Sequence, residues 1–377
     1  MPDVLIRADT LRSAELRHEV PVAVGDPFLY VERDGARHVL VSALEVPRLR
    51  DLGVEVHPYE EFGLDELRRS GLSSGEIDDE LSVRAVRALG VERAAVPPSF
   101  PLGLADKLRA AGVELTPDPG LFVARRRVKT PAELDGIRRA QAAAEAGMAA
   151  ARDLLRRARR DGSGLAVGGE PLTCERVKAA VAGALLAHDA SCDGLIVSHG
   201  AQSAIGHHAG EGPIGEGEPV VVDLWPRDGA SGCSADMTRT FVVGDVPAEV
   251  AAWHRLCVEA LERAFAAIRP GVTGRQVYDR ACDVFEAAGY PTQRTKRDGE
   301  TLEEGFFHSL GHGVGLEVHE LPVLGIVGHE ELLAGEVLAV EPALYRPGVG
   351  GCRLEDLVVV TEAGAENLTR FPYDLAP

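Results

Sequence analysis

The chain begins with short apolar runs that alternate with charged, helix-favouring stretches. Over about the first 120 residues, runs such as FLYVE, RHVLVSAL and VEVHPY are separated by stretches such as LDELRRSG and LADKLRAAG. The apolar runs predict strands and the intervening stretches predict helices, so we expect a small α/β domain here. No residue cluster in this region indicates catalysis.

A segment rich in proline and glycine follows, and a basic run comes directly after it. Residues 115–134 read LTPDPGLFVARRRVKTPAEL. This composition is typical of an exposed connection between domains. It predicts a boundary near residue 125, with an N-terminal domain over residues 1–125 and a second domain over residues 126–377.

The second domain mixes longer helices with short strands. Thr130 is a good N-cap, with Pro131 at the first helical position and Glu133 in the first turn, and it predicts a helix to about residue 159. Further helices are expected over about 248–268 and 273–288. Strand-like runs lie between or after them at DGLIVSHG, EPVVVDLWP, SADMTRTFVVG, GHGVGL and VVVTEAG. This order predicts an α+β domain.

Composition narrows the classes of function. Lys and Arg number 40 against 59 Asp and Glu, which gives a net charge of −19. Such a surface repels phosphate backbones and anionic lipid, so neither nucleic acid nor membrane is an expected partner. The six cysteines form no CxxC pair, and the N-terminus has no apolar leader. We therefore expect a reduced, cytoplasmic location.

Residues with metal-binding side chains end or interrupt five of the apolar runs. Isolated carboxylates at the ends of buried strands are costly, because desolvation disfavours their charge unless a cation meets it. Two divalent cations would balance four negative charges, which favours a two-metal hydrolase. Taken singly, each acid is better explained as a solvated residue at a strand end, and their joint occurrence argues against that. In chain order the five residues are Asp223, Asp236, His312, Glu341 and Glu355.

Strand alternation assigns side chains to faces. In SADMTRTFVV, Asp236, Thr238 and Thr240 share one face, and Met237 and Phe241 share the other. The carboxylate is therefore expected among hydroxyl groups.

The same rule applied to GGCRLEDLVVV places Arg353 and Glu355 on one face and Asp356 on the other. An arginine two residues from a ligand carboxylate is expected to orient it or to stabilise developing negative charge.

Histidines gather in two polar segments. His308, His312 and His319 stand among glycines in HSLGHGVGLEVHE, where the backbone can come close to a bound group. Phosphate binding is a poor alternative, since GHGVG has neither GxGxxG spacing nor a following GK[ST]. His207 and His208 form a second pair in SHGAQSAIGHHAGEGP, for which a surface turn remains an alternative.

The five ordered ligands, with SADMTRT, HSLGHGVGLEVHE, VEPALY and GCRLEDLVVVTE, resemble the "pita-bread" metallopeptidases, in the branch of prolidase and Xaa-Pro aminopeptidase (aminopeptidase P). The resemblance covers about residues 125–377. It implies a pita-bread catalytic domain, and the segment before it looks like the smaller creatinase-type N-terminal domain of that branch.

The resemblance also implies roles for the residues. Asp223 would bind one metal ion through both oxygens, Asp236 and Glu355 would bridge the two ions, and His312 and Glu341 would complete the ligands of the second ion. The ions, most readily manganese but also cobalt, zinc or iron, would share a water and present hydroxide to a peptide carbonyl. The remaining implied roles are proton transfer by Glu341, substrate and oxyanion contacts by His207 and His319, pocket lining by His308, and support of the bridging acid by Arg353.

The expected function is therefore hydrolysis of Xaa-Pro bonds in peptides or dipeptides, by a homodimer. Two departures from the family pattern bear on this: Trp225 stands where a glycine is usual and is expected to reshape the pocket, and Asp228 competes with Asp223 as a ligand. The alternatives are another C–N hydrolase on the same scaffold with a substrate that lacks proline, and a non-catalytic binding module. Retention of all five ligands argues against the module.

Overall fold

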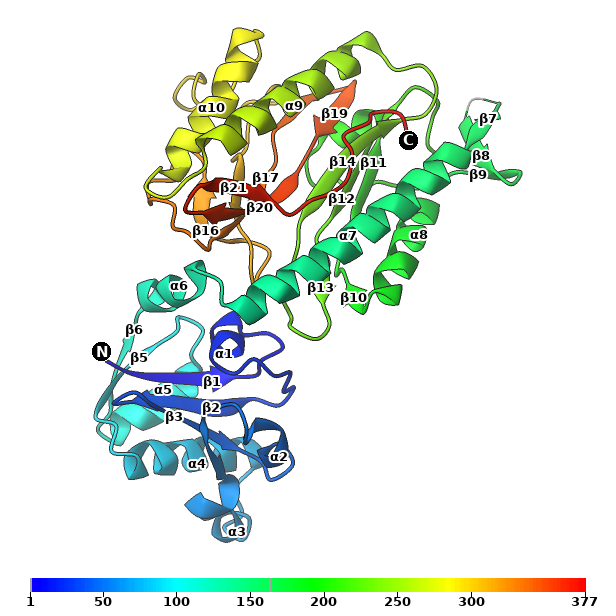
Figure 1. Ribbon diagram of the computed structural model, residues 1–377. Coiled ribbons are helices and arrows are strands. Elements are labelled where there is room, and N and C mark those ends of the chain that lie inside the picture. Colours follow the sequence, from blue (N-terminus) through cyan, green and yellow to red (C-terminus); the bar gives the residue numbers. More distant parts are fainter. Residues whose placement is uncertain (1, 163) are drawn as a thin grey trace. The chain divides into compact units, whose positions relative to one another are not determined.

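The computed structural model describes residues 2–162 and 164–377, and the chain forms two compact units, one ending at Arg126 and the other running from Arg127 to Pro377 (Figure 1). Each unit has its own apolar core. None of the helices within the described residues is both long and apolar enough to cross a membrane.

The first unit is a six-stranded mixed sheet with helices on both faces. Its strands are β1 (Asp3–Ala8), β2 (Phe28–Arg33), β3 (Ala36–Val41), β4 (Glu55–Pro58), β5 (Arg93–Val96) and β6 (Glu114–Pro117), in the order β4-β3-β2-β1-β5-β6. Its helices are α1 (Ala14–Glu19), α2 (Val46–Leu49), η1 (Tyr59–Phe62), α3 (Leu64–Leu67), α4 (Ser74–Ala88), α5 (Leu102–Ala110) and α6 (Pro119–Arg127). Alternate residues of β1 enter different cores: Leu5 packs with the residues of α4 and α5, and Val4 packs with those of α1. The expected α/β pattern is therefore present.

The segment expected to be an exposed connection contains the division between the two units, at Arg126, but much of it is helical. Helix α6 begins where the Asp118 carboxylate accepts a hydrogen bond from the backbone N–H of Leu121 at 3.0 Å, and Pro119 occupies the first helical position. Phe122 is buried in the core that α1 also enters. The proline and glycine start a helix here, and one apolar side chain anchors it.

The second unit consists of two groups of strands, each backed by a pair of helices. Helices α7 (Pro131–Arg157) and α8 (Cys174–Ala187) pack against the sheet β11 (Ile196–His199), β12 (Pro219–Leu224) and β14 (Met237–Val242). Helices α9 (Ala248–Ala267) and α10 (Gly274–Ala287) pack against strands of the other group. That group contains β15 (Gly311–Gly313), β16 (Glu320–Leu324), β17 (Val337–Val340), β20 (Asp356–Thr361) and β21 (Gly364–Asn367), ordered β16-β15-β17-β20-β21, and the hairpin β18 (Ala343–Arg346) with β19 (Gly350–Arg353).

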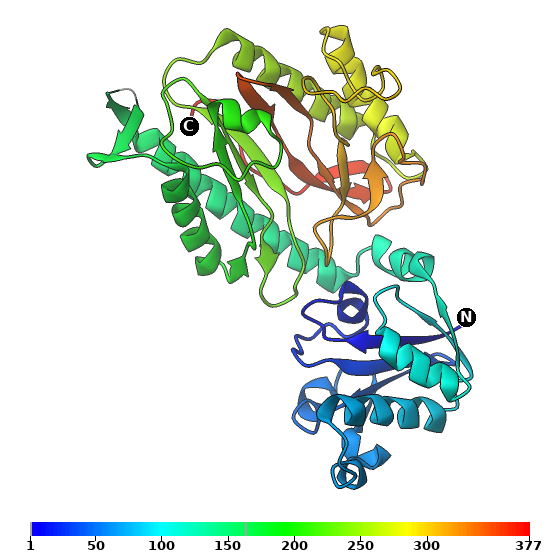
Figure 2. The same ribbon diagram turned by 180° about the vertical axis from the view of Figure 1, so that it is seen from behind.

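Figures 1 and 2 show the two helix pairs on the outside of the strands in this unit. The strands themselves face one another, and their facing ends hold the polar residues singled out above. The remaining short elements are β7 (Arg159–Asp161), β8 (Gly164–Val167), β9 (Glu170–Pro171), β10 (Ala190–Ser191), η2 (Gly200–Ala204) and β13 (Arg227–Asp228).

Helix starts were predicted well in this unit. Thr130 caps α7 together with Glu133, and Thr273 caps α10 in the same way. Helix α8 was missed, although Thr173 caps it and its buried residues follow a spacing of three or four residues. Its Ala-rich sequence contains few charged residues, so the apolar face stands out weakly against the rest of the helix.

The glycines of GHGVG serve the sheet. Gly311 and Gly313 lie in β15, which runs between β16 and β17. A Cβ atom at Gly311 would overlap the carbonyl oxygen of Ala339, and one at Gly313 would overlap that of Leu321. These glycines therefore let neighbouring strands approach closely, and His312 between them is held rigidly.

Candidate active site

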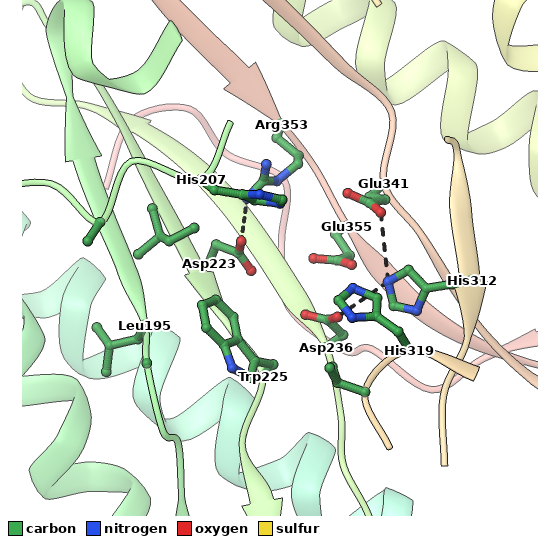
Figure 3. A pocket seen from close by; sticks show the side chains of 14 residues that line it. Leu195, His207, Asp223, Trp225, Asp236, His312, His319, Glu341, Arg353 and Glu355 are labelled. Carbon is green, nitrogen blue, oxygen red and sulfur yellow. Dashed lines mark hydrogen bonds and ion pairs between the residues drawn. The ribbon is translucent and has the colours of Figure 1, made fainter. Parts of the chain in front are cut away.

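The five predicted ligands meet in one cavity of about 480 Å³ in the second unit (Figure 3). Both groups of strands contribute: Asp223 lies in β12, Asp236 directly precedes β14, His312 is in β15, Glu341 follows β17 and Glu355 precedes β20. Strand ends from the two groups thus place four carboxylates and one imidazole around a common space. The described residues that line it are Gly194, Leu195, Ile196, His207, Ala209, Asp223, Trp225, Asp236, His312, Val318, His319, Glu341, Arg353 and Glu355.

Three of these residues are close enough to share an ion. Asp236, His312 and Glu355 each offer a ligand atom, and these atoms lie within 4.8 Å of one another. The Nε2 atom of His312 is 3.7 Å from Oδ2 of Asp236 and 3.7 Å from Oε1 of Glu341. The set joins oxygen donors to a single nitrogen, which suits Mn²⁺, Co²⁺, Fe²⁺ or Zn²⁺.

The protein alone offers little positive charge to balance the negative charge of these carboxylates. Burial, and then the neighbouring Glu355, raises the pKa of Asp236 well above its usual value, and burial with Glu341 does the same to Glu355. Burial also raises the pKa of Glu341 to about 7, although Arg353 opposes the change. Among the described residues that line the cavity, Arg353 is the only lysine or arginine. The residues therefore fit divalent cations, which would stabilise the charged carboxylates.

The imidazole of His312 is suited to binding a cation. Burial, with His319 close by, lowers the pKa of His312 to about 4, so the ring is neutral at neutral pH. Its Nδ1 atom is 3.1 Å from the carbonyl oxygen of Gly313, which makes Nδ1 the protonated nitrogen. Nε2, which faces Asp236 and Glu341, then has a free lone pair with which it could bind a metal ion.

Arg353 holds a different carboxylate from the one expected. Its Nη2 atom forms an ion pair with Oδ2 of Asp223, and Nη1 donates to the hydroxyl of Tyr345 at 2.9 Å. Glu355 instead accepts a hydrogen bond of 2.7 Å from the Thr238 hydroxyl. Arg353 reaches Glu355 only through Thr238, whose hydroxyl also accepts a hydrogen bond of 3.3 Å from Nε of Arg353. A direct contact is absent from these contacts because β19 ends at Arg353 and β20 begins at Asp356, so the two residues do not share one regular strand.

The predicted histidines divide into two groups. His207 and His319 line the cavity, and the ring of His319 is 4.3 Å from that of His312 between centroids. His308 is not among the lining residues; its Nε2 atom is 3.3 Å from the Tyr345 hydroxyl, and its Nδ1 atom is 4.0 Å from Oε2 of Glu341. His308 therefore lies beside Glu341 and Tyr345, next to the residues that line the cavity. His208 uses Nδ1 to accept a hydrogen bond from the backbone N–H of Gly210.

The two departures noted in the sequence have separate outcomes. Trp225 lines the cavity, as expected, and faces the same space as Asp223 (Figure 3). Asp228 does not line the cavity: its carboxylate accepts hydrogen bonds from Arg139 at 3.1 and 2.9 Å and from Ser231. Although burial works against it, these contacts hold the pKa of Asp228 below its usual value. The alternative that Asp228 replaces Asp223 as a ligand is therefore wrong.

Tyr345 is the main residue of the site that the sequence analysis did not identify. It is buried, and its hydroxyl joins Arg353 to His308. A signal was present, because Tyr345 stands four residues after Glu341 in VEPALY, and even spacing in an extended segment directs side chains to one side. The apolar wall made by Leu195 and Val318 has no comparable signature in the sequence.

Comparisons with known proteins agree with this arrangement. Residues 135–362 match the model of metallopeptidase family M24. A probable dipeptidase PepE from Mycobacterium tuberculosis is 38% identical over 182 residues, which are 48% of this chain and 45% of the relative. An Xaa-Pro dipeptidase from Pyrococcus furiosus is 36% identical over 183 residues, 48% of each chain. The matched segment thus spans about half the length of these curated relatives.

Solved structures extend the likeness to the whole chain. An Xaa-Pro dipeptidase from Bacillus anthracis superposes with a TM-score of 0.80 at 24% identity, over 100% of this chain and 94% of that one. The dipeptidase PepE of Mycobacterium ulcerans gives a TM-score of 0.75 at 29% identity, over 100% and 93%. The pita-bread fold expected from the sequence is confirmed.

Proposed function

The chain belongs to metallopeptidase family M24, and from this premise we propose that it is an exopeptidase that hydrolyses Xaa-Pro bonds, either in dipeptides or at the N-terminus of longer peptides. The observation that carries the proposal is the cavity in which Asp236, Glu341 and Glu355 have raised pKa values and face one another. A peptidase that uses divalent ions needs such a group of carboxylates, whereas a binding surface gains nothing from it.

Five residues would hold two divalent ions: Asp223, Asp236, His312, Glu341 and Glu355. When bound, such ions supply Lewis-acid polarisation of a carbonyl oxygen and lower the pKa of a coordinated water. Manganese is the proposed ion, because most of the donors are carboxylate oxygens.

The chain's own groups supply the proton transfers and the oxyanion contacts. The Glu341 carboxyl lines the cavity beside the other ligands, where it would accept a proton from the attacking water and donate it to the leaving nitrogen. His207 and His319 face the cavity and carry N–H groups that stabilise the oxygen of the tetrahedral intermediate. Arg353 fixes the orientation of Asp223, and His308 acts through Tyr345 as a positioning residue.

The apolar side of the cavity indicates where the substrate's apolar part packs. Leu195 and the indole of Trp225 line it (Figure 3). Val318 also lines the cavity. A pyrrolidine ring and a short aliphatic side chain fit such a wall without leaving a polar group unpaired. The acids then remain close to the scissile bond.

A panel of substrates tests this function. Chelator-treated protein supplied with Mn²⁺ is assayed on Xaa-Pro dipeptides, on the matched Xaa-Ala dipeptides and on longer peptides that begin Xaa-Pro. Preference for the Xaa-Pro members supports the proposal. Equal turnover of proline and alanine members, or turnover of the alanine members alone, refutes the proline requirement.

A second candidate is a dipeptidase that does not require proline. Trp225 in the cavity wall favours it, as does the similarity to the probable dipeptidase PepE, whose name specifies no proline. The Trp225→Gly variant separates the two candidates in the same panel. If the indole excludes proline, this variant gains Xaa-Pro activity relative to the wild-type chain, and if the indole packs on proline, it loses that activity.

We also propose a cytoplasmic homodimer, on the resemblance alone. Light scattering of the purified chain measures the mass in solution, and a monomeric mass over the working concentration range contradicts the dimer.

A further inference from the structure

A second group of metal-ligating side chains lies in the first unit, on the strands β3 and β4. His38 of β3 is in register with Glu55 of β4, and His57 lies two residues further along β4. Nδ1 of His38 is 3.2 Å from Nε2 of His57 and 3.3 Å from Oε2 of Glu55. One ligand atom from each of the three residues lies within 4.8 Å of the others.

The ring of His57 is held so that one nitrogen is available. Its Nδ1 atom is 2.8 Å from Oε2 of Glu61, which keeps the proton on Nδ1. Nε2 then carries a lone pair and points to His38. A carboxylate behind a histidine is the arrangement that fixes the tautomer and orientation of metal-binding imidazoles.

The two donor separations that involve His38 match those of a tetrahedral ion. With bonds of about 2.0–2.1 Å, neighbouring ligands of tetrahedral zinc lie about 3.3 Å apart. The distances of 3.2 and 3.3 Å from His38 to its two partners agree with that separation. A hydrogen bond between the rings also fits 3.2 Å, but the single hydrogen on Nδ1 of His38 cannot fully serve both His57 and Glu55.

The protonation and exposure of the group also suit a cation. Burial lowers the pKa of His38, and His57 lowers it further against the opposing effect of Glu55, so the ring stays neutral at neutral pH. The Glu55 side chain is 66% exposed, while that of His38 is 12% exposed. An ion here would have partly buried nitrogen donors on one side and open positions for water on the other.

We propose that His38, Glu55 and His57 bind one Zn²⁺ ion, with Glu61 orienting His57 and water completing the coordination. Two imidazoles and one carboxylate are a donor set found in zinc sites. The ion would link β4, the edge strand of the sheet, to β3. The site is separate from the cavity of the second unit, and it does not depend on the peptidase activity proposed above.

Zinc binding is measured in the full chain after the ligands of the second unit are disabled. The background is the double variant Asp236→Asn/Glu355→Gln, stripped with chelator and titrated with Zn²⁺ by calorimetry. We expect one Zn²⁺ per chain and a higher melting temperature on zinc addition. His57→Ala in that background is expected to weaken binding at least about tenfold and to remove the thermal shift. The matched control is His329→Ala, which changes an exposed histidine outside the group and is expected to bind zinc as the background does.

Two further variants test zinc binding at this site if the His57→Ala variant does not fold. Glu55→Gln changes an exposed side chain and retains both imidazoles, and Glu61→Gln removes only the carboxylate behind His57. Both are expected to lower zinc affinity, the second by about 10- to 100-fold. The proposal is overturned if the background binds no zinc, or if its affinity is the same with and without these carboxylates.

Discussion

Arg353 forms an ion pair with Asp223, although the two residues are 130 positions apart in the chain. The same guanidinium donates to the Tyr345 hydroxyl and to the carbonyl oxygen of Gly206. Burial alone would lower the pKa of Arg353, but nearby Tyr345 and Asp223 raise it well above its usual value. A permanently charged, planar group therefore fixes the first carboxylate of the site.

Arg353→Lys tests this arrangement. Lysine keeps the positive charge but lacks the planar group that reaches Asp223, Tyr345 and Gly206 together. We expect metal affinity or kcat to fall about 10- to 100-fold, as for other residues that orient metal ligands. Metal titration and kinetics of the variant measure both quantities. Unchanged values would show that charge alone is sufficient.

Glu341→Gln tests the proton-transfer role. The amide cannot accept the proton of the attacking water, so kcat is expected to fall by about 10²- to 10⁴-fold while the chain stays folded and retains metal. Circular dichroism and elemental analysis check folding and metal content. The exposed Glu330→Gln is the matched control and is expected to leave kcat unchanged. Near-normal turnover in Glu341→Gln refutes the assignment.

Variants of Asp223 and Asp228 test which of the two aspartates is a metal ligand and which has only a structural role. Asp223→Asn is expected to lose metal, because the amide loses both the negative charge and the ion pair with Arg353 that orients the side chain. Asp228→Asn is expected to keep metal but to lower the free energy of unfolding by about 1–3 kcal/mol, since Arg139 and Ser231 lose a charged acceptor. Metal content and urea unfolding of both variants check this. Metal loss in Asp228→Asn would reverse the assignment.

The pH dependence of stability in the metal-free chain follows from the raised pKa of the acids. A carboxyl whose pKa is raised by folding contributes stability that is present below its unfolded pKa and is lost as the pH rises through its folded pKa. For Glu341 the folded value is about 7, and Asp236 and Glu355 are also raised. His308 and His312 have pKa values lowered to about 4, so their effect on stability is opposite: they lower it at acid pH. This effect is confined mainly to pH values below about 6.5, where histidines of the unfolded chain take up protons.

The melting temperature of the chelator-treated chain is therefore expected to fall between about pH 6.5 and 8. Thermal denaturation at several pH values measures it. Glu341→Gln should show a smaller fall, and added divalent metal should remove most of it. A melting curve that does not move over this range in the wild-type chain contradicts the charge balance described for the cavity.

Much of the site could be predicted because local rules determine it. Each candidate acid ends or interrupts an apolar run, and alternation in SADMTRT puts Asp236 and Thr238 on one face of a strand. Helix caps at Thr130 and Thr273 were readable from adjacent residues. These features depend on sequence separations of a few residues.

Other features depend on how distant strands pair, which periodicity does not reveal. The contact of Arg353 with Asp223 needs the break between β19 and β20 and the position of β12. In the first unit, His38 and His57 are 19 residues apart, and the parallel register of β3 with β4 brings them together. The sequence analysis consequently found no residue cluster in this region.

The most direct test of the account is an activity titration of the metal-stripped chain with Mn²⁺, in which bound metal and Xaa-Pro dipeptide turnover are measured on the same samples. The wild-type chain is expected to regain turnover as Mn²⁺ binds and to reach a plateau when two ions occupy the cavity, whereas Asp236→Asn should bind less metal and stay inactive. Full turnover without metal, or equal metal binding and turnover in Asp236→Asn, would contradict the central claim that these carboxylates hold the ions that support hydrolysis.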